Sequence, residues 1–155
     1  MKSITSEQQA YIAGFLDGDG SIYVQAKPNS TYRYGYQIAP YVVLFQSAKS
    51  ESEFLKVCNL INLGHLRKRK DKILEYIIGQ IDQLKEFLRL VEPFVILKKK
   101  QVGLMLQILD QKDRIKNKND FEALLKLIDL FREFNYSKKR IKRTLTPQRL
   151  ARKSG

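Results

Sequence analysis

Two aspartates close together in the chain, Asp17 and Asp19, are the residues whose type and spacing most directly suggest chemistry. They alternate with glycines in the run Asp17-Gly18-Asp19-Gly20, which follows a stretch with helical periodicity. Carboxylates at the C-terminal end of a helix are electrostatically disfavoured, because that end already carries partial negative charge. A divalent cation with oxygen ligands would offset this repulsion. The alternative is an ordinary helix followed by an Asp-Gly turn in which both aspartates are solvated.

The helix that positions these aspartates is predicted to begin near Glu7, because Ser6 and Gln9 have the spacing of a capping box. Its small residues fall three and four positions apart and therefore share one face with the first aspartate. That face consists of Ala10, Ala13, Gly14 and Asp17. Small side chains let two helix backbones approach closely, so we expect this face to contact a second helix. The larger residues of the stretch would anchor the helix in a core; these are Tyr11, Ile12, Phe15 and Leu16.

The two glycines of the run suit the left-handed turn that ends a helix, and Gly20 also permits close approach of another group. Residues 12–20, Ile-Ala-Gly-Phe-Leu-Asp-Gly-Asp-Gly, resemble the nine-residue signature of the LAGLIDADG homing endonucleases, identically or conservatively at each position. The similarity extends over roughly residues 6–145, including Gly20-Ser21-Ile22, Lys27-Pro28-Asn29, Glu92-Pro93-Phe94 and Lys98-Lys99-Lys100-Gln101. In that family the signature helix forms the subunit or domain interface, and its last aspartate binds the catalytic metal. A single copy resembles the homodimeric branch.

The charge of the chain points to a polyanionic partner. Its 155 residues contain 29 Lys and Arg against 16 Asp and Glu, a formal net charge of +13. Nucleic acid is the most common partner of such a chain, and a membrane surface is the competitor. The longest apolar runs, residues 41–45 and 94–97, are far too short to span a bilayer, and no basic amphipathic helix supports surface binding. We therefore expect no membrane partner.

The single cysteine and the single histidine exclude several kinds of site. Cys58 rules out an internal disulfide and cysteine-rich zinc sites, and its place on an apolar helical stripe predicts a core thiol. With His65 as the only histidine, no Ser-His-Asp triad or histidine-rich metal site stands out. No signal peptide is evident at the N-terminus. These features favour an intracellular protein, in an organelle (chloroplast or mitochondrion) or a prokaryotic cytoplasm, whose chemistry uses carboxylates and a hard cation.

The remaining sequence predicts an α+β fold. Residues 21–27 and 32–46 read as strands, residues 50–64 as a helix beginning with a Ser50–Glu53 capping box, and residues 65–70 and 72–78 as a hairpin. We expect Pro40 at a sheet edge or a bulge, because proline cannot donate a ladder hydrogen bond. Helices follow near residues 81–91, 98–109 and 120–134. The order αββαββα plus C-terminal helices is that of the LAGLIDADG fold, in which helices back a four-stranded antiparallel saddle.

If the helices cover one face of this sheet, the other face is free to read DNA. Glutamine suits adenine, arginine suits guanine, and lysine suits guanine or phosphate. The predicted DNA contacts on this face and its first loop are Tyr23, Gln25, Lys27, Asn29, Gln37, Tyr41, Arg67, Arg69 and Glu75. The alternative is an ordinary solvated sheet face, and the second strand is less polar here than base reading requires.

Beyond the last helix, the chain from Ser137 onward has basic residues and no acid. We expect one endonuclease domain over residues 1–136 and a basic, partly flexible segment over residues 137–155. Phosphate contacts are predicted in that segment for Lys138, Lys142 and Arg143.

The resemblance also implies roles in catalysis. Asp19 and the backbone carbonyl of Gly18 would bind Mg²⁺, with Mn²⁺ or Ca²⁺ as substitutes in binding. Gln46 would orient the hydrolytic water network, and Lys98 would stabilise charge at the scissile phosphate. Lys49 is assigned an accessory role, since relatives often place a basic residue shortly after the glutamine. The simpler interpretations are a polar strand end for Gln46 and an ordinary helix start for Lys98.

Together these features predict a homodimeric, Mg²⁺-dependent homing endonuclease that breaks both strands of a long, nearly palindromic DNA site. Two copies of one chain suit this task, because the strands of a duplex are themselves related by a two-fold axis. The alternative is a non-cleaving nucleic-acid binder of the same fold, such as an RNA-splicing maturase or a transcription factor.

Overall fold

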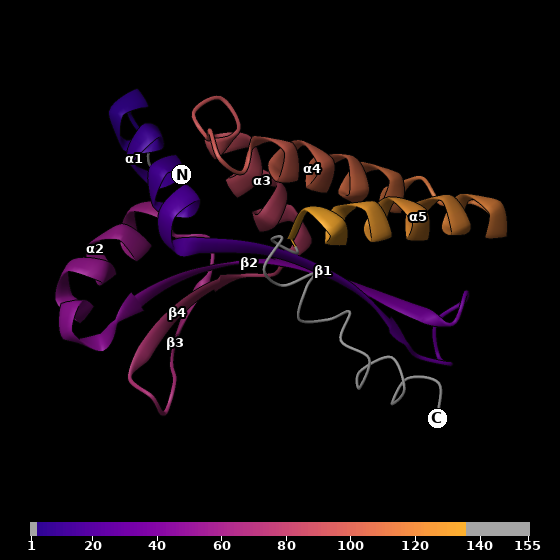
Figure 1. The fold of residues 1–155 in the computed structure, drawn as a ribbon, viewed down its shortest axis with the longest axis horizontal. Coiled ribbons are helices and arrows are strands. Elements are labelled where there is room, and N and C mark those ends of the chain that lie inside the picture. Colours follow the sequence, from indigo (N-terminus) through magenta and orange to yellow (C-terminus); the bar gives the residue numbers. More distant parts are fainter. Residues whose placement is uncertain (1–2, 136–155) are drawn as a thin grey trace, which may run out of the picture.

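Two pairs of strands, each preceded by a helix, are followed by three further helices in residues 3–135, the part of the chain that the computed structural model describes (Figure 1). The strands are β1 (Gly20–Pro28), β2 (Tyr36–Ser47), β3 (His65–Lys68) and β4 (Ile73–Ile78). The helices are α1 (Ser6–Asp19), α2 (Glu51–Ile61), α3 (Ile81–Val91), α4 (Lys99–Asp113) and α5 (Lys118–Asn135), with a short 3₁₀ turn, η1 (Ala48–Ser50), before α2. The predicted order αββαββα with further C-terminal helices is confirmed.

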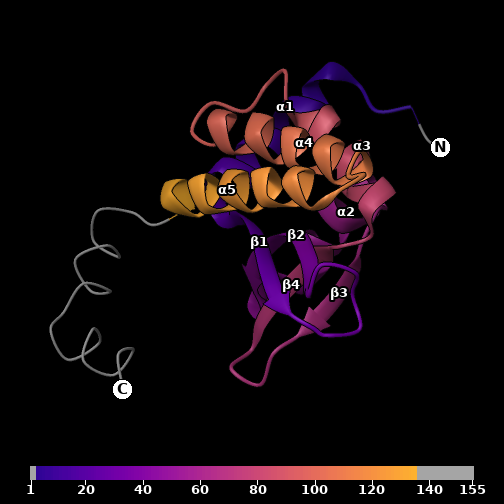
Figure 2. The ribbon, with the colours of Figure 1, turned by 90° about the vertical axis from the view of Figure 1, so that its right-hand side faces the viewer.

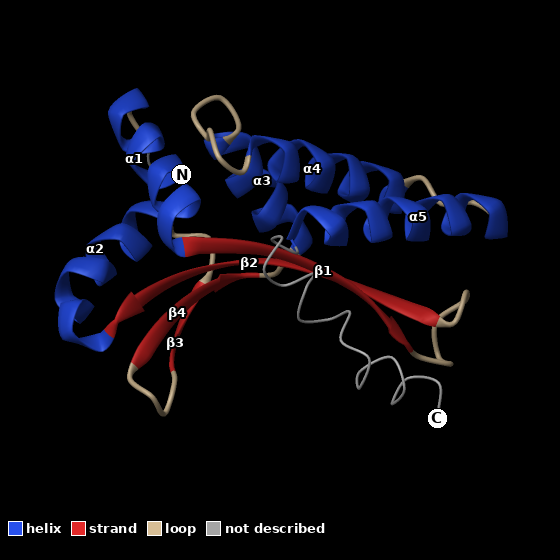
Figure 3. Cartoon of the chain, viewed as in Figure 1, coloured by secondary structure: helices blue, strands red, loops and turns tan. Residues whose placement is uncertain are grey.

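The four strands form one antiparallel sheet in the order β1-β2-β4-β3. Figures 1 and 3 show this sheet as a long curved layer with the helices gathered on one side, and the turned view of Figure 2 shows the same two layers end-on. The described elements therefore leave the opposite face of the sheet open over much of its length.

Within residues 3–135 no helix is long and apolar enough for a membrane crossing.

Side chains that alternate along the strands build the core against the helices. Ile22 and Val24 of β1, with Val42 and Leu44 of β2, are at most 3% exposed and belong to one continuous apolar cluster. The helices supply residues such as Leu84, Phe87, Met105 and Phe131, each fully buried. Cys58 lies in the same cluster, and burial raises the pKa of its thiol to about 11. The predicted core thiol is confirmed, and at neutral pH it stays protonated.

The start of α1 differs by one residue from the expected one. Thr5 is the N-cap, and the capping box joins Thr5 to Gln8: the Gln8 amide donates to the Thr5 hydroxyl over 3.2 Å, and Gln8 Oε1 accepts from the Thr5 amide over 3.0 Å. The Ser6–Gln9 pair predicted from the sequence is the same spacing shifted by one position. Both residue pairs have the spacing of a capping box, and the helix begins with the earlier pair, Thr5 and Gln8.

The end of α1 also differs from the prediction, because it has no left-handed glycine. The helix continues through Asp19 and passes directly into β1 at Gly20, whose φ of −122° is extended backbone. Glycine is required there for space: a Cβ would lie 2.7 Å from Leu16 Cδ1 and 2.9 Å from the Leu16 carbonyl oxygen. The expected close approach at Gly20 is confirmed, and it holds the aspartate-bearing helix end tightly against the sheet.

Two details of α2 differ from the prediction, whereas the position of Pro40 agrees with it. Ser50 is the N-cap of α2 as expected but makes no side-chain capping bond, and Glu53 instead accepts a hydrogen bond from Ser52. The left-handed residue that ends α2 is Asn62, with φ of 52°. At Pro40, β2 pairs with β1 but not with β4, whose pairing begins at Val42. One side of the proline thus has no neighbouring strand, as a residue without an amide donor requires.

Tyr76 ties the start of the β3–β4 hairpin to the core. Its hydroxyl accepts from the amides of Leu63 (2.9 Å) and Gly64 (2.7 Å), and the residue is 3% exposed. Tyr76→Phe would leave both amides without this acceptor, so we expect a loss of about 1–3 kcal/mol of unfolding free energy. Urea denaturation measures this, with Tyr36→Phe at an exposed position as the matched control. Equal stability of Tyr76→Phe and the unmodified protein would contradict the prediction.

Candidate functional site

Asp19, the last residue of α1, presents a free carboxylate at the junction of α1 and β1. Its side chain is exposed, and within residues 3–135 no hydrogen bond or ion pair engages it. The carbonyl of Gly18 has no helical partner either, because the residue four positions on, Ile22, already belongs to β1. One carboxylate and one main-chain carbonyl are thus available at this point, and both are hard oxygen donors of the kind that Mg²⁺ and Ca²⁺ prefer.

This donor set suits a divalent cation but does not complete its coordination. Among the described residues, no group of three or more His, Cys, Asp or Glu side chains could hold a metal ion. The described residues therefore supply fewer than three such side chains to a cation at Asp19.

Asp17, in contrast, is fully engaged within its own chain. Its Oδ2 accepts from the amides of Ile96 (2.8 Å) and Leu97 (3.0 Å), and its Oδ1 accepts from the amide of Lys98 (3.0 Å). Asp17 was predicted at the interface between subunits; its carboxylate binds amides of its own chain, and the interface position stays a prediction. These three amides offset the repulsion expected between the Asp17 carboxylate and the negative helix end.

Lys98, which is 81 residues from Asp17 in the sequence, lies at the same helix end. Its ammonium donates to the carbonyl oxygen of Asp17 over 3.0 Å, which places a positive charge at the negative end of α1. Gln46 lies at the end of β2, two residues beyond the pairing of Leu44 with Gly20, and its Oε1 accepts from the Ser47 amide over 2.9 Å. The fold thus gathers Asp19 and Lys98 at the end of α1 and brings Gln46 to the same end of the β1–β2 pair.

Lys49, the accessory residue, lies just beyond Gln46 in η1. Its side chain is exposed, and its amide donates to the Ser47 hydroxyl over 3.2 Å. The structure therefore keeps this lysine close in the chain to Gln46 and leaves its ammonium accessible from solvent.

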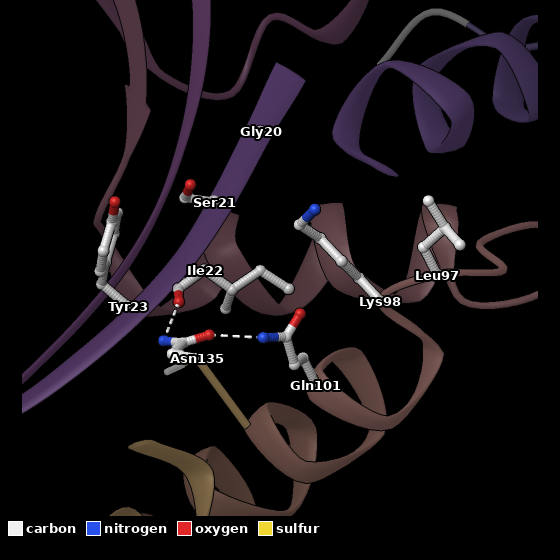
Figure 4. A pocket seen from close by; sticks show the side chains of 8 residues that line it. All are labelled: Gly20, Ser21, Ile22, Tyr23, Leu97, Lys98, Gln101 and Asn135. Atoms are coloured by element: carbon white, nitrogen blue, oxygen red, sulfur yellow. Dashed lines mark hydrogen bonds between the residues drawn. The ribbon is translucent and has the colours of Figure 1, made fainter. Parts of the chain in front are cut away.

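A pocket beside Lys98 contains two residues that the sequence analysis missed, Gln101 and Asn135 (Figure 4). Its volume of about 250 Å³ is room for several water molecules. Asn135 donates to the Ile22 carbonyl over 2.6 Å and accepts from Gln101, so one amide pair links α4, α5 and β1. Gln101 could have been found from its spacing, since it lies three residues after Lys98 on a predicted helix. No sequence signal distinguishes Asn135 from other polar helix ends.

The exposed stripe of α1 is the predicted one in part: Ala10 and Gly14 lie on it, but Ala13 does not. Ala13 is 0% exposed and packs in the chain's own core, so its assignment to a contact with another subunit was wrong. Tyr11, expected in the core, is 57% exposed, and Ala10, Gly14 and Gly18 are exposed with it. A Cβ on Gly14 would meet nothing within 4 Å. The free face of α1 is therefore Ala10, Tyr11, Gly14 and Gly18.

Two further apolar side chains extend this free face, and both were missed in the sequence. Ile96 and Leu97 are each 79% exposed. Their amides bind Asp17, so they lie beside the end of α1. A smooth helix face bordered by large exposed apolar residues is typical of a protein–protein contact.

The open face of the sheet carries the predicted DNA contacts in register. Facing residues are Tyr23 and Tyr41, Gln25 and Ala39, Lys27 and Gln37, and Arg67 and Glu75. Lys27 and Gln37 lie near the end of the β1–β2 pair that is farthest from α1. Arg67 and Glu75 lie on the β3–β4 hairpin, where Glu75 pairs with Phe45 of β2. Between them Val43 pairs with both Ser21 and Ile77. The face thus consists of two polar patches, a β1–β2 patch (Gln25, Lys27, Gln37) and a hairpin patch (Arg67, Glu75), separated by an apolar band of Val43, Phe45 and Ile77.

Charges in the hairpin patch are arranged in pairs. Arg67 lies 3.7 Å from Glu75, whose side chain is 15% exposed. Arg69 was predicted on the same strand face, but β3 ends at Lys68, and Arg69 lies in the turn, where it binds Asp71 over 2.7 Å. Its place on the strand was therefore wrong, although its guanidinium remains at the tip of the hairpin.

Two other predicted contacts lie near the β1–β2 patch. The Tyr41 ring packs against the tilted ring of Tyr23, with centroids 5.0 Å apart. Burial raises the pKa of Tyr41, as do Tyr23 and Glu75 nearby, so its hydroxyl stays a donor at neutral pH. Asn29 begins the loop after β1, and its Oδ1 accepts from both the amide and the hydroxyl of Thr31. The phosphate contacts predicted at Lys138, Lys142 and Arg143 lie outside the described residues.

Comparison with known proteins gives a consistent result. The LAGLIDADG endonuclease family matches residues 12–109. DNA endonuclease I-CreI of Chlamydomonas reinhardtii is 35% identical over 131 residues, which cover 84% of this chain and 80% of that protein. A crystal structure of the homing endonuclease I-CvuI with the I-CreI DNA target and Mg, in which the DNA is not cleaved, matches with a TM-score of 0.78 and 28% identity over 86% of this chain and 85% of that one. The homing endonuclease I-TnaI matches with a TM-score of 0.72 and 25% identity over 93% and 97%.

Proposed function

The chain belongs to the LAGLIDADG endonuclease family, and on this basis we propose that it is a site-specific homing endonuclease. As a homodimer it binds a long, nearly palindromic duplex and hydrolyses a phosphodiester bond in each strand with the help of Mg²⁺. The observation that carries the proposal is the free carboxylate of Asp19 at the same helix end as the ammonium of Lys98. A protein that only bound DNA would have no use for this combination.

The homodimer is supported by the free face of α1. Ala10 and Gly14 allow a second α1 helix to approach closely, and Tyr11 offers a large side chain to it. Ile96 and Leu97 would be covered in the same contact, which explains why such large apolar groups face solvent in one chain. Two-fold pairing of these helices would bring two Asp19 carboxylates together, one from each subunit.

The metal completes what one chain lacks. Mg²⁺ held by Asp19 and the Gly18 carbonyl would polarise the scissile phosphate and lower the pKa of a bound water. Gln46 has its amide nitrogen available, besides the oxygen bound to Ser47, to orient water near the site. Lys98 keeps two of its three N–H donors for the phosphate when the third binds Asp17. Lys49, exposed in η1, would add a second positive charge beyond Gln46.

The open sheet face would hold the DNA, and I-CvuI, which has a similar fold, forms complexes with DNA targets. Gln25, Lys27 and Gln37 offer donors and acceptors suited to base edges at one end, and Arg67 with Glu75 offers them at the other. Lys138, Lys142 and Arg143 would add phosphate contacts, which position the duplex without reading its sequence.

We expect Arg67→Ala to relax base preference at one position in each half of the target. An arginine that binds guanine through two of its N–H groups is worth roughly 1–3 kcal/mol of discrimination. The matched control is Lys68→Ala, which removes one positive charge from the neighbouring residue of β3. Lys68 binds Glu51 of α2 over 3.2 Å and is not assigned to base reading. Binding titrations against single-base target variants measure both. An Arg67→Ala protein that loses affinity equally for every variant would refute the assignment.

The proposed function is tested by incubating the purified protein with a randomised duplex library, with Mg²⁺ or with excess chelator, and sequencing the cut ends. We expect double-strand breaks at one family of nearly palindromic sites with Mg²⁺, and none with chelator. Selective binding to DNA or RNA without cleavage under any divalent cation would favour the non-cleaving alternative instead.

A further inference from the structure

Asp17 links the helix that carries Asp19 to the segment that carries Lys98. Three successive amides, those of Ile96, Leu97 and Lys98, converge on its carboxylate at 2.8–3.0 Å. Successive amides that converge in this way form a concave anion site. In this protein, the chain's own aspartate fills the anion site just before α4, and the N-cap of α4 has no side-chain bond of its own.

The link is reciprocal, because Lys98 is bound to Asp17 at both ends. Its amide donates to Asp17 Oδ1, and its ammonium donates to the Asp17 carbonyl oxygen, each over 3.0 Å. A lysine side chain has four rotatable bonds and is normally mobile at a surface. Here the two bonds fix the backbone and the charged end of Lys98 relative to one residue of α1.

A metal-binding role for Asp17 fits these contacts poorly. A carboxylate oxygen has about two lone-pair positions, and Oδ2 already accepts two amides while Oδ1 accepts one. The two aspartates of the signature therefore divide their work, with Asp19 free and Asp17 engaged.

We propose that Asp17 is a positioning residue for catalysis, which holds the Lys98 ammonium at a set place relative to Asp19 of the same chain. The inference rests on the proposed function, since it acts through the contact of Lys98 with the scissile phosphate. Asp17 lies two residues before Asp19 on α1, so the bonds to Asp17 fix the distance between the metal-binding carboxylate and the ammonium.

The test is a double-mutant cycle between Asp17→Asn and Lys98→Met, measured as single-turnover cleavage of the selected target at saturating protein. Asparagine keeps the size of Asp17 but places an NH₂ group against amide donors. We expect a rate roughly 100-fold lower, the loss that a small misplacement of a catalytic group causes. In the Lys98→Met background the same substitution should have little further effect. Asp110→Asn, on the exposed surface of α4, is the charge-matched control with an unchanged rate.

Three further measurements separate this role from others. DNA affinity in Ca²⁺, the Mg²⁺ concentration for half-maximal rate, and dimer formation should all match the unmodified protein. Hydrogen exchange at the Ile96, Leu97 and Lys98 amides should accelerate in Asp17→Asn. Asp17→Glu keeps the charge and should recover part of the rate, and its cycle with Lys98→Met does not depend on the folding of the asparagine variant.

Each result has a defined meaning. Equal losses from Asp17→Asn with and without Lys98, a raised Mg²⁺ requirement, or a monomeric variant would each overturn the positioning role. An unmodified protein that cleaves no DNA would overturn the proposed function and this role together. Cleavage by the unmodified protein with an unaffected Asp17→Asn variant would overturn this role alone.

Discussion

Asp19→Asn is expected to reduce the rate of DNA cleavage by roughly 10²–10³-fold or more, the loss typical for removing one group that stabilises the transition state. The substitution keeps the size of the side chain and removes the negative charge that would hold a divalent cation. Because Asp19 has no partner among residues 3–135, the fold should be unaffected. Binding to the target should persist, since the sheet face is unchanged. Single-turnover cleavage and a binding titration in Ca²⁺ measure the two effects separately.

The control for this prediction is Asp113→Asn, which also removes a carboxylate but one that binds Lys85 near the far end of α4. Its cleavage rate should be unchanged. Full activity of Asp19→Asn, or activity of the unmodified protein in excess chelator, would exclude the assigned metal site. Mixed dimers with one Asp19→Asn subunit should show whether both strands need both carboxylates.

Gly14→Leu is expected to weaken the proposed dimer and to reduce double-strand cleavage with it. In the single chain a side chain at Gly14 meets nothing within 4 Å, so the monomer should fold normally. In the proposed dimer, the added side chain would hold the two α1 helices apart. Overpacking of this kind costs about 1–3 kcal/mol, which corresponds to a roughly 5- to 160-fold weaker dimer. Sedimentation at several concentrations measures the dissociation constant.

A second glycine provides the contrast. Gly20→Ala places a Cβ 2.9 Å from the Leu16 carbonyl oxygen inside the chain, so it should lower the melting temperature of the protein itself. Gly14→Leu should not lower the melting temperature of the isolated chain, because leucine favours a helix more than glycine does. If the unmodified protein sediments as a monomer, or if Gly14→Leu remains a fully active dimer, the proposed contact through α1 is wrong.

The sheet could be predicted from the sequence because its signal is local. Ile22, Val24 and the residues between them alternate with a period of two, and that period alone assigns the two faces. The same logic placed Arg67 and Glu75 on the open face correctly. It failed at Arg69, because β3 ends at Lys68 and a turn has no fixed period.

The site was harder to predict, because its decisive contacts are distant in sequence. Asp17 and Lys98 are 81 residues apart, and nothing near Asp17 indicates that three amides will meet it. Ala13 failed for another reason: a small residue suits close packing against a sheet as well as against a second helix. Helical spacing identifies a face, but it does not identify which neighbour covers that face.

The apolar band of Val43, Phe45 and Ile77 has a consequence for how the enzyme's target can change over generations. Apolar side chains distinguish little in the major groove except the methyl group of thymine, whereas the polar patches on either side can distinguish all four base pairs. Only Phe45 and Ile77 of this band could contact DNA, because Val43 is 2% exposed. In the proposed binding mode, base pairs opposite them would tolerate substitution with less loss of recognition than base pairs opposite the patches, so target sites that differ there would still be bound.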